Sequence, residues 1–206
     1  MAEAEAPAAM NPREAILSRV RGALAPLGAR APLPETASQG SPASGDPKAE
    51  FASRLRLAGG ELLSSPGEIP GRLAAGGWTR GYCDPSLWPA LGPVFGRGFV
   101  VEREFDQGRL DDYEFGITRA AGAIAETGTI IINDALTSRR LAALAPWVHI
   151  AVLRRCDILA TLPEAIAALG GDPNVIWCTG PSKTADVEGI LIQGVHGPGV
   201  QIALVL

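Results

Sequence analysis

The sequence has few cysteines and histidines, the residues that most often hold zinc ions and iron–sulfur clusters. Its 206 residues include only three cysteines and two histidines. Cys83, Cys156 and Cys178 are widely spaced and form no C-x-x-C pair, so they offer no ligand set for an iron–sulfur cluster or a zinc site, and no redox dithiol. We therefore expect no cofactor in this chain and interpret each cysteine as a small buried hydrophobic residue.

The sequence also lacks long apolar runs and an excess of positive charge. No apolar run approaches the roughly 20 residues that span a bilayer. The N-terminal MAEAEAPAAMNPREA carries acidic residues where a secretory signal needs basic ones. The formal net charge of -4 offers no general attraction to nucleic-acid phosphates or anionic lipids. We expect a cytoplasmic protein with no membrane span and no nucleic-acid partner.

Composition divides the chain near residue 47. Asn11-Pro12-Arg13-Glu14 is typical of a helix start, with an N-cap, a proline at the first position and an early acid, and this helix should reach about Leu24. Residues 25–47 are dense in Pro, Gly, Ser and Ala, with too little apolar side chain to offset the entropy of ordering. We predict an N-terminal helix and linker over residues 1–47 and one folded domain over residues 48–206.

Helix and strand patterns alternate through the second region. The expected helices cover residues 48–58, 69–75, 85–91, 138–144 and 163–169. The expected strands cover residues 61–64, 78–83, 99–102, 129–132, 148–153, 175–178 and 201–206. This alternation predicts an α/β fold with a mostly parallel sheet covered on both faces, and ligands at the carboxyl ends of its strands.

The first candidate site is Ala125-Glu126-Thr127-Gly128-Thr129, directly before the strand at 129–132. A tight bend there can expose backbone N–H groups, and Glu126 can serve as a general base, a nucleophile or a hydroxyl-binding carboxylate if it faces a pocket. The alternative is a polar turn whose glutamate is solvated.

The second candidate site is the segment TGPSKTAD, residues 179–186, which follows the strand at 175–178 and is expected to open a short helix. A helix N-terminus favours anions, Ser182 and Thr184 offer hydroxyl groups, and Lys183 is one of only two lysines in the chain. The segment therefore suits a phosphate or a carboxylate. Alternatively, Ser182 or Thr184 caps the helix and Asp186 lies in its first turn.

The third candidate site is Gly194-Val195-His196-Gly197-Pro198, just before the last strand. His196 can exchange a proton near neutral pH or bind an anion as imidazolium. His149 lies inside the apolar run 147–153 and is expected to be a hydrogen-bonded core residue or a strand-edge residue. The spacings of a Walker motif, a dinucleotide fingerprint and a serine-hydrolase elbow are all missing.

Three segments together resemble the LutC/YkgG family of lactate-utilization proteins, whose domain is called LUD or DUF162. They are AIAETGTIII, TGPSKTADVEGILIQGVHGP and the closing VQIALVL. The resemblance covers about residues 113–206. It implies a three-layer α/β/α fold of the NagB/RpiA/CoA-transferase type. It also implies a role in oxidising L-lactate to pyruvate together with LutA-like and LutB-like partners, which carry the iron–sulfur clusters.

The resemblance also implies a shared pocket, because the three candidate sites match the family's AETG, GPS and GVHGP loops. We expect Lys183 and His196 to hold a small anion, such as lactate, pyruvate, a nucleotide or CoA, with Glu126 at its reactive or hydroxyl-bearing part. The remaining ligand-binding candidates are Thr127, Gly128, Thr129, Gly180, Ser182, Thr184, Asp186 and Gly197. The resemblance does not assign catalysis to this chain. A freestanding CoA-transferase-like or formyltetrahydrofolate cyclo-ligase-like enzyme, or a ligand sensor, is the alternative.

Overall fold

A computed structural model describes residues 11–26, 45–134, 136–137, 140–169, 174–185 and 189–206. The chain separates into two units, residues 1–38 and 39–206. In the first unit, α1 (Pro12–Leu24) begins as expected, with Asn11 Oδ1 accepting a hydrogen bond of 3.0 Å from the Arg13 N–H. No residue of α1 is buried, and its exposed apolar side chains are Ile16, Val20 and Leu24.

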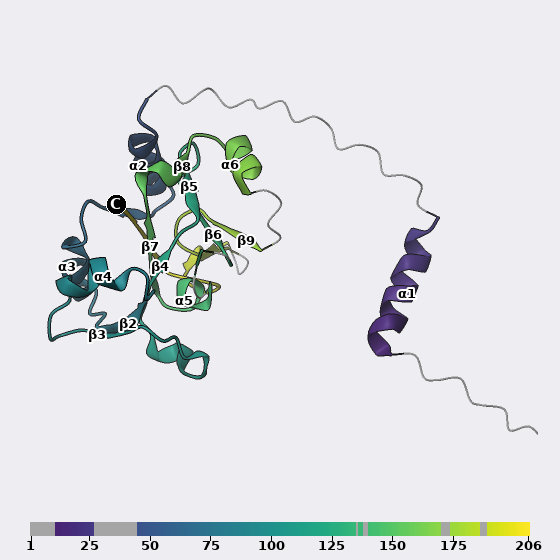
Figure 1. Cartoon of the computed structure of the whole chain (residues 1–206), viewed down its shortest axis with the longest axis horizontal. Coiled ribbons are helices and arrows are strands. Elements are labelled where there is room, and N and C mark those ends of the chain that lie inside the picture. The colour runs from purple at the N-terminus through teal and green to yellow at the C-terminus, as the bar shows by residue number, and fades with distance from the viewer. Residues whose placement is uncertain (1–10, 27–44, 135, 138–139, 170–173, 186–188) are drawn as a thin grey trace, which may run out of the picture. The chain divides into compact units, whose positions relative to one another are not determined.

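A six-stranded sheet, parallel throughout, forms the centre of the second unit (Figure 1). In sheet order its strands are β1 (Glu61–Leu63), β12 (Val200–Val205), β7 (Val148–Leu153), β4 (Phe115–Arg119), β2 (Arg80–Cys83) and β3 (Val100–Glu102). Neighbouring side chains of β7 and β12 alternate between two separate apolar clusters, one on each face. The sheet is therefore buried on both sides, which confirms the predicted α/β class.

Helices cover both faces of this sheet. α3 (Glu68–Ala75) and α4 (Trp88–Leu91) pack on one face through Ile69, Leu73 and Leu91. α2 (Pro47–Leu57) and α5 (Arg140–Leu144) lie on the other face, where α2 contributes Phe51 and Leu55 to the core. Short 3-10 turns connect some elements, at η1 (Gly92–Val94), η2 (Gln107–Asp112) and η3 (Arg155–Asp157).

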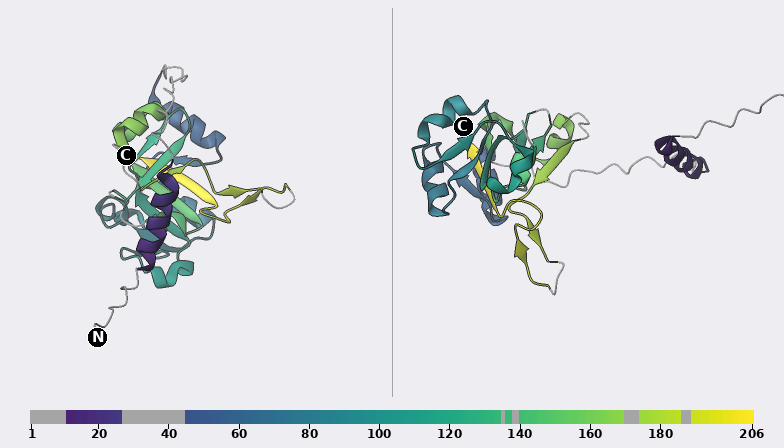
Figure 2. Two further views of the ribbon diagram at one scale, coloured as in Figure 1. Left: turned by 90° about the vertical axis from the view of Figure 1, so that its right-hand side faces the viewer. Right: turned by 90° about the horizontal axis from the view of Figure 1, so that it is seen from below.

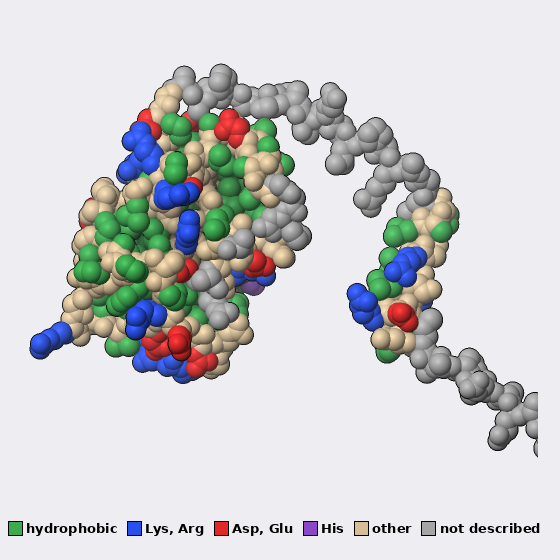
Figure 3. Space-filling view, in the orientation of Figure 1, with side chains coloured by type: hydrophobic (Ala, Val, Ile, Leu, Met, Phe, Trp, Pro, Cys, Tyr) green, Lys and Arg blue, Asp and Glu red, His purple; other side chains and the backbone are tan. Residues whose placement is uncertain are grey.

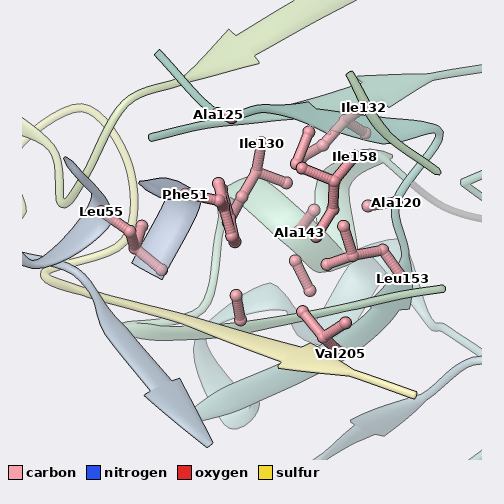
Figure 4. Packing of buried hydrophobic residues seen from close by; sticks show 13 residues of the cluster. Phe51, Leu55, Ala120, Ala125, Ile130, Ile132, Ala143, Leu153, Ile158 and Val205 are labelled. Atoms are coloured by element: carbon pink, nitrogen blue, oxygen red, sulfur yellow. The ribbon is translucent and has the colours of Figure 1, made fainter. Parts of the chain in front are cut away.

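A second, mixed sheet completes the layer on the α2 side. Its order is β8 (Ile158–Leu159), β5 (Gly122–Ile124), β6 (Thr129–Asn133) and β9 (Val175–Cys178), and α6 (Leu162–Leu169) packs beside it. The apolar cluster between the two sheets includes Phe51, Leu55, Ile130, Ile132 and Val205 (Figure 4).

This second sheet corrects the prediction that the strands at 129–132 and 175–178 join one mostly parallel sheet. The strands expected at 129–132 and 175–178 exist, but they belong to the second sheet and pair with each other antiparallel. Only four residues separate β5 from β6. Because a parallel pairing needs a crossover of a dozen or more residues, this short turn requires an antiparallel hairpin.

The prediction of a helix that opens within residues 179–186 is also wrong. The described residues form an antiparallel hairpin instead, in which β10 (Lys183–Thr184) pairs with β11 (Ile192–Gln193). Figure 2 shows this hairpin extending away from the rest of the unit.

The cysteines differ in exposure. Cys83 is buried, and burial raises the pKa of its thiol to about 12. Burial also raises the pKa of Cys178 to about 11. Cys156 is exposed, so the expectation that all three are buried is wrong for that residue. Among the described residues, no group of three or more His, Cys, Asp and Glu side chains could hold a metal ion.

No helix in the described part of the chain has the length and apolar character needed to cross a membrane.

His149 is a fully buried histidine at the start of β7, as expected of a core residue. Its Nε2 lies 2.9 Å from Thr118 Oγ1 on β4, and its Nδ1 lies 3.0 to 3.2 Å from the side-chain amide of Gln201 on β12. Both ring nitrogens therefore have partners, as buried polar groups require. Burial lowers the pKa of His149 to about 4, while the hydrogen bond to Gln201 acts in the opposite direction. The ring is therefore neutral at pH 7.

We predict that His149 makes the domain less stable in acid. The unfolded chain binds a proton at an ordinary histidine pKa near 6.5, whereas the folded chain does not bind it until about pH 4. Its contribution is fully present above pH 6.5 and declines as the pH falls towards 4, by about 3 kcal/mol in the free energy of unfolding. Urea unfolding at pH 7 and pH 4 measures this loss. His149→Gln should lose about 3 kcal/mol less than the wild type between these two pH values, and an equal loss in both proteins would contradict the assignment.

Candidate functional site

The turn between β5 and β6 lies against the last turn of α2. Gly128 has a φ of 67°, in the left-handed region that favours glycine. A Cβ at this position would lie 2.3 Å from the backbone nitrogen of Leu55. The glycine of the AETG segment is therefore required both by the backbone conformation and by the close approach of the helix.

The loop after β9 contacts the same end of α2. Gly180 has a φ of 73°, and a Cβ there would lie 2.3 Å from the carbonyl oxygen of Ala58. Lys183 Nζ donates a hydrogen bond of 3.0 Å to that same oxygen. Ala58 is the C-cap of α2, so the lysine satisfies a carbonyl that the helix leaves unpaired and places its charge at the negative end of the helix dipole.

A chain of three threonine hydroxyls joins these two segments. Thr129 Oγ1 lies 2.7 Å from Thr127 Oγ1 and 2.7 Å from Thr179 Oγ1. Thr129 is buried at the start of β6, while Thr127 and Thr179 are exposed. A hydroxyl has one donor and two acceptor positions, so the outer two threonines retain capacity to bind a polar ligand. Thr179 begins the second candidate segment directly after a strand, but it was not among the predicted binding residues.

The GVHGP loop joins this cluster through Ser182. The Ser182 N–H donates to the Pro198 carbonyl at 2.9 Å, and the Gly194 N–H donates to the Ser182 carbonyl at 2.8 Å. A Cβ at Gly197 would lie 3.4 Å from the Ser182 Cβ. His196, between these residues, has an exposed side chain. The second and third candidate sites are thus adjacent, and we call the three contacting segments 126–129, 179–184 and 194–198 the loop cluster.

The loop cluster lies at the amino end of the parallel sheet. Its last segment leads into β12, and Ala58 precedes β1. The expectation of a site beyond the carboxyl ends of the strands is therefore wrong for these loops. The physical cause is that β6 and β9 belong to the second sheet, so the loops beside them do not follow strands of the first sheet. The expected helix within residues 179–186 is replaced among the described residues by the hairpin, and α2 faces the cluster with its carboxyl end, so no helix N-terminus contributes to anion binding there.

Glu126 contacts a different helix. Its Oε1 accepts a hydrogen bond from the Leu162 N–H, in the first turn of α6. This carboxylate therefore satisfies an unpaired helix N–H, at the end of the dipole that favours negative charge. Within the described residues, no hydrogen bond or ion pair joins Glu126 to Lys183 or His196. Thr184 pairs with Ile192 in the hairpin, and Asp186 lies outside the described residues.

The structure is that of an α/β domain. It has a parallel six-stranded sheet with helices on both faces, a second mixed sheet and loops that require glycine. The family model of the LUD domain matches residues 93–206, which contain the whole loop cluster. The chain belongs to the LUD domain family.

Relatives of known name agree with this assignment. The chain is 37% identical to "Lactate utilization protein C" of Deinococcus radiodurans over 65% of this chain and 66% of the relative. It is 33% identical to the protein of that name from Bacillus licheniformis, over 54% of this chain and 50% of the relative. These matches thus span about half to two thirds of the relatives' own lengths.

A solved structure has a similar fold. It is the crystal structure of a DUF162 family protein from Deinococcus radiodurans, which is 28% identical to this chain and superimposes with a TM-score of 0.56. The similarity covers 78% of this chain and 96% of that one.

We predict that Gly128→Ala destabilises the domain by about 3 kcal/mol or more, because it combines left-handed backbone strain with overlap against the helix backbone. Gly189→Ala is the matched control. Gly189 has a φ of 71° but no atom within 4 Å of its added Cβ, so Gly189→Ala should lower the free energy of unfolding by only about 1 kcal/mol. Urea denaturation of both variants tests the difference, and equal losses would show that the contact with α2 contributes nothing.

Proposed function

We propose that this protein is a component of an L-lactate utilization system and supports the oxidation of L-lactate to pyruvate. The observation that carries the proposal is membership of the LUD domain family, together with 28–37% identity to three relatives named "Lactate utilization protein C". The matched family region contains every described residue of the loop cluster.

In this proposal the chain acts with LutA-like and LutB-like iron–sulfur partner proteins and carries no cluster itself. Its three cysteines are dispersed in the sequence, and two of them are wholly or partly buried in different elements. A cluster needs several thiolates around one centre. The electron-transfer chemistry is therefore assigned to the partners, and this chain contributes binding and assembly.

The loop cluster is the proposed ligand site, and a small carboxylate such as lactate or pyruvate is the proposed ligand. The Lys183 ammonium has three donors, and the Ala58 carbonyl takes one of them. Two donors remain for a carboxylate, and exposed His196 can add a donor from a loop that contacts the backbone of Ser182, the residue before Lys183. Thr127 and Thr179 supply hydroxyls to the polar part of the ligand.

The alternative, a freestanding CoA-transferase-like or cyclo-ligase-like enzyme, has less support. It needs Glu126 as a nucleophile free to attack an acyl group. The carboxylate instead accepts a hydrogen bond from the Leu162 N–H in the first turn of α6. Shared fold alone is weak evidence for either chemistry.

The proposal predicts that a strain lacking this protein grows poorly with L-lactate as sole carbon source and normally on glucose. The wild-type gene should restore growth on lactate. Lys183→Ala and His196→Ala should restore it only in part, because each removes a ligand donor. Arg56→Ala, a change of an exposed cation near the end of α2, should restore it fully and serves as the control. Normal lactate growth of the deletion strain would remove the proposal.

The contribution of Lys183 to stability is measured separately from its effect on growth. Lys183→Ala should lower the free energy of unfolding by no more than about 1 kcal/mol, as expected for one exposed cap interaction. If growth is lost only because the protein is unstable, a thermal unfolding scan will show a large fall in melting temperature. In that case the ligand role of Lys183 is rejected.

A further inference from the structure

A hollow lies beyond the carboxyl ends of β2 and β3, at the end of the sheet opposite to the loop cluster. Its volume is about 710 Å³, and its lining includes Pro85, Trp88, Pro89, Val101 and residues 102–104. Ligands of open parallel sheets bind outside the carboxyl ends of the strands. Nothing in the proposed lactate function uses this hollow.

Trp88 forms a rigid aromatic surface in the hollow. Its ring stacks on Phe95 with the centroids 6.2 Å apart and the planes 6° apart, and Phe95 stacks in turn on buried Phe115 of β4. A Cβ on Gly92 would lie 2.7 Å from Trp88 Cε2, so the glycine makes room for the ring. Buried Asp84 fixes the preceding turn by accepting hydrogen bonds from the backbone and hydroxyl of Ser86. The ring is thus held in place before any ligand arrives.

The guanidinium of Arg103 lies over the same tryptophan ring, with its Cζ 5.6 Å from the centroid. A planar ring inserted between them needs two stacking distances of about 3.5 Å each. Arg103 would have to move outward by about 1.4 Å, the difference between that sum and the present distance. Its side chain is exposed on a flexible stem, so this movement is easy.

The two glutamates of the lining differ in their hydrogen-bond and ion-pair partners. Glu102 is bound by Arg80 at 2.7 Å, by Arg109 at 2.6 Å and by the Tyr113 hydroxyl at 3.0 Å. Arg109 of η2 also pairs with Asp106, and Figure 3 shows acidic and basic side chains gathered at the lower edge of the unit. Glu104 is exposed, and no described residue pairs with it. One free carboxylate, an acceptor only, therefore lies at the rim of the hollow.

These charges select the class of ligand. A cation over Trp88 would compete with Arg103 for the ring, and an anionic ring would be repelled by Glu104. A neutral heteroaromatic ring with N–H donors avoids both costs, because it stacks between Trp88 and Arg103 and donates to Glu104. Purine bases have this chemistry, and their two fused rings cover more of the tryptophan than a pyrimidine does. We propose that the hollow binds the base of a purine nucleoside, stacked on Trp88.

Isothermal titration calorimetry of the full chain with adenosine, guanosine, uridine and choline tests the proposal. We expect saturable binding of at least one purine nucleoside, weaker binding of uridine and no binding of choline. Trp88→Ala should weaken purine binding by about 5-fold to 100-fold, as expected when base–aromatic stacking is lost. Trp177→Ala, a change of a half-exposed tryptophan on β9, should leave the affinity unchanged.

Two further variants guard against misfolding of Trp88→Ala. Trp88→Phe keeps a stacking surface and should retain most of the affinity. Glu104→Gln changes only an exposed side chain and should weaken purine binding several-fold, because a charged acceptor makes the stronger hydrogen bond. No purine binding at millimolar concentration, binding that survives Trp88→Ala, or binding of choline in place of purines would each overturn the proposal. These results do not depend on growth on lactate, so either proposal can fail alone.

Discussion

The contact between the last turn of α2 and two glycine turns determines how the parts of this domain fit together. Gly128 and Gly180 bring two separate loops against the backbone of Leu55 and Ala58. The same helix places Phe51 and Leu55 in the core between the two sheets. Because a side chain on either glycine would overlap the helix backbone, the loops can approach only with no Cβ at these positions. The second sheet, the hairpin and the hydroxyl chain all depend on that approach.

In this arrangement the charged residues Lys183 and Glu126 each interact with the end of a helix. The helix faces the loops with its carboxyl end, so the helix dipole stabilises the cationic Lys183 there. Glu126 lies at the opposite kind of end, the first turn of α6. Each charge therefore stabilises a helix terminus. The lysine retains donors for a ligand, whereas the glutamate is held as an acceptor within the fold.

Strand β4 could not be predicted from its own residues, because two of them are needed by neighbouring elements. β4 is central, yet its sequence FGITR is weakly apolar and was not predicted as a strand. Gly116 is needed because a Cβ there would overlap the Ala142 carbonyl oxygen, and Thr118 is the hydrogen-bond partner of buried His149. The two residues that hide the strand from its sequence pattern are both required by neighbours distant in the chain. A local pattern contains no information about such neighbours.

The sequence alone determined the α/β class, the positions of most helices and strands, the core location of His149 and the family resemblance. These features follow from local periodicity, capping residues and short motifs, which act over a few neighbouring residues. Tertiary structure decided that β6 and β9 pair antiparallel within a separate, mixed sheet, that Lys183–Thr184 and Ile192–Gln193 form a hairpin, and that the loops gather at the amino end of the parallel sheet. The reason is that strand pairing and helix-end contacts join residues far apart in the chain, and the same apolar run can serve in either sheet.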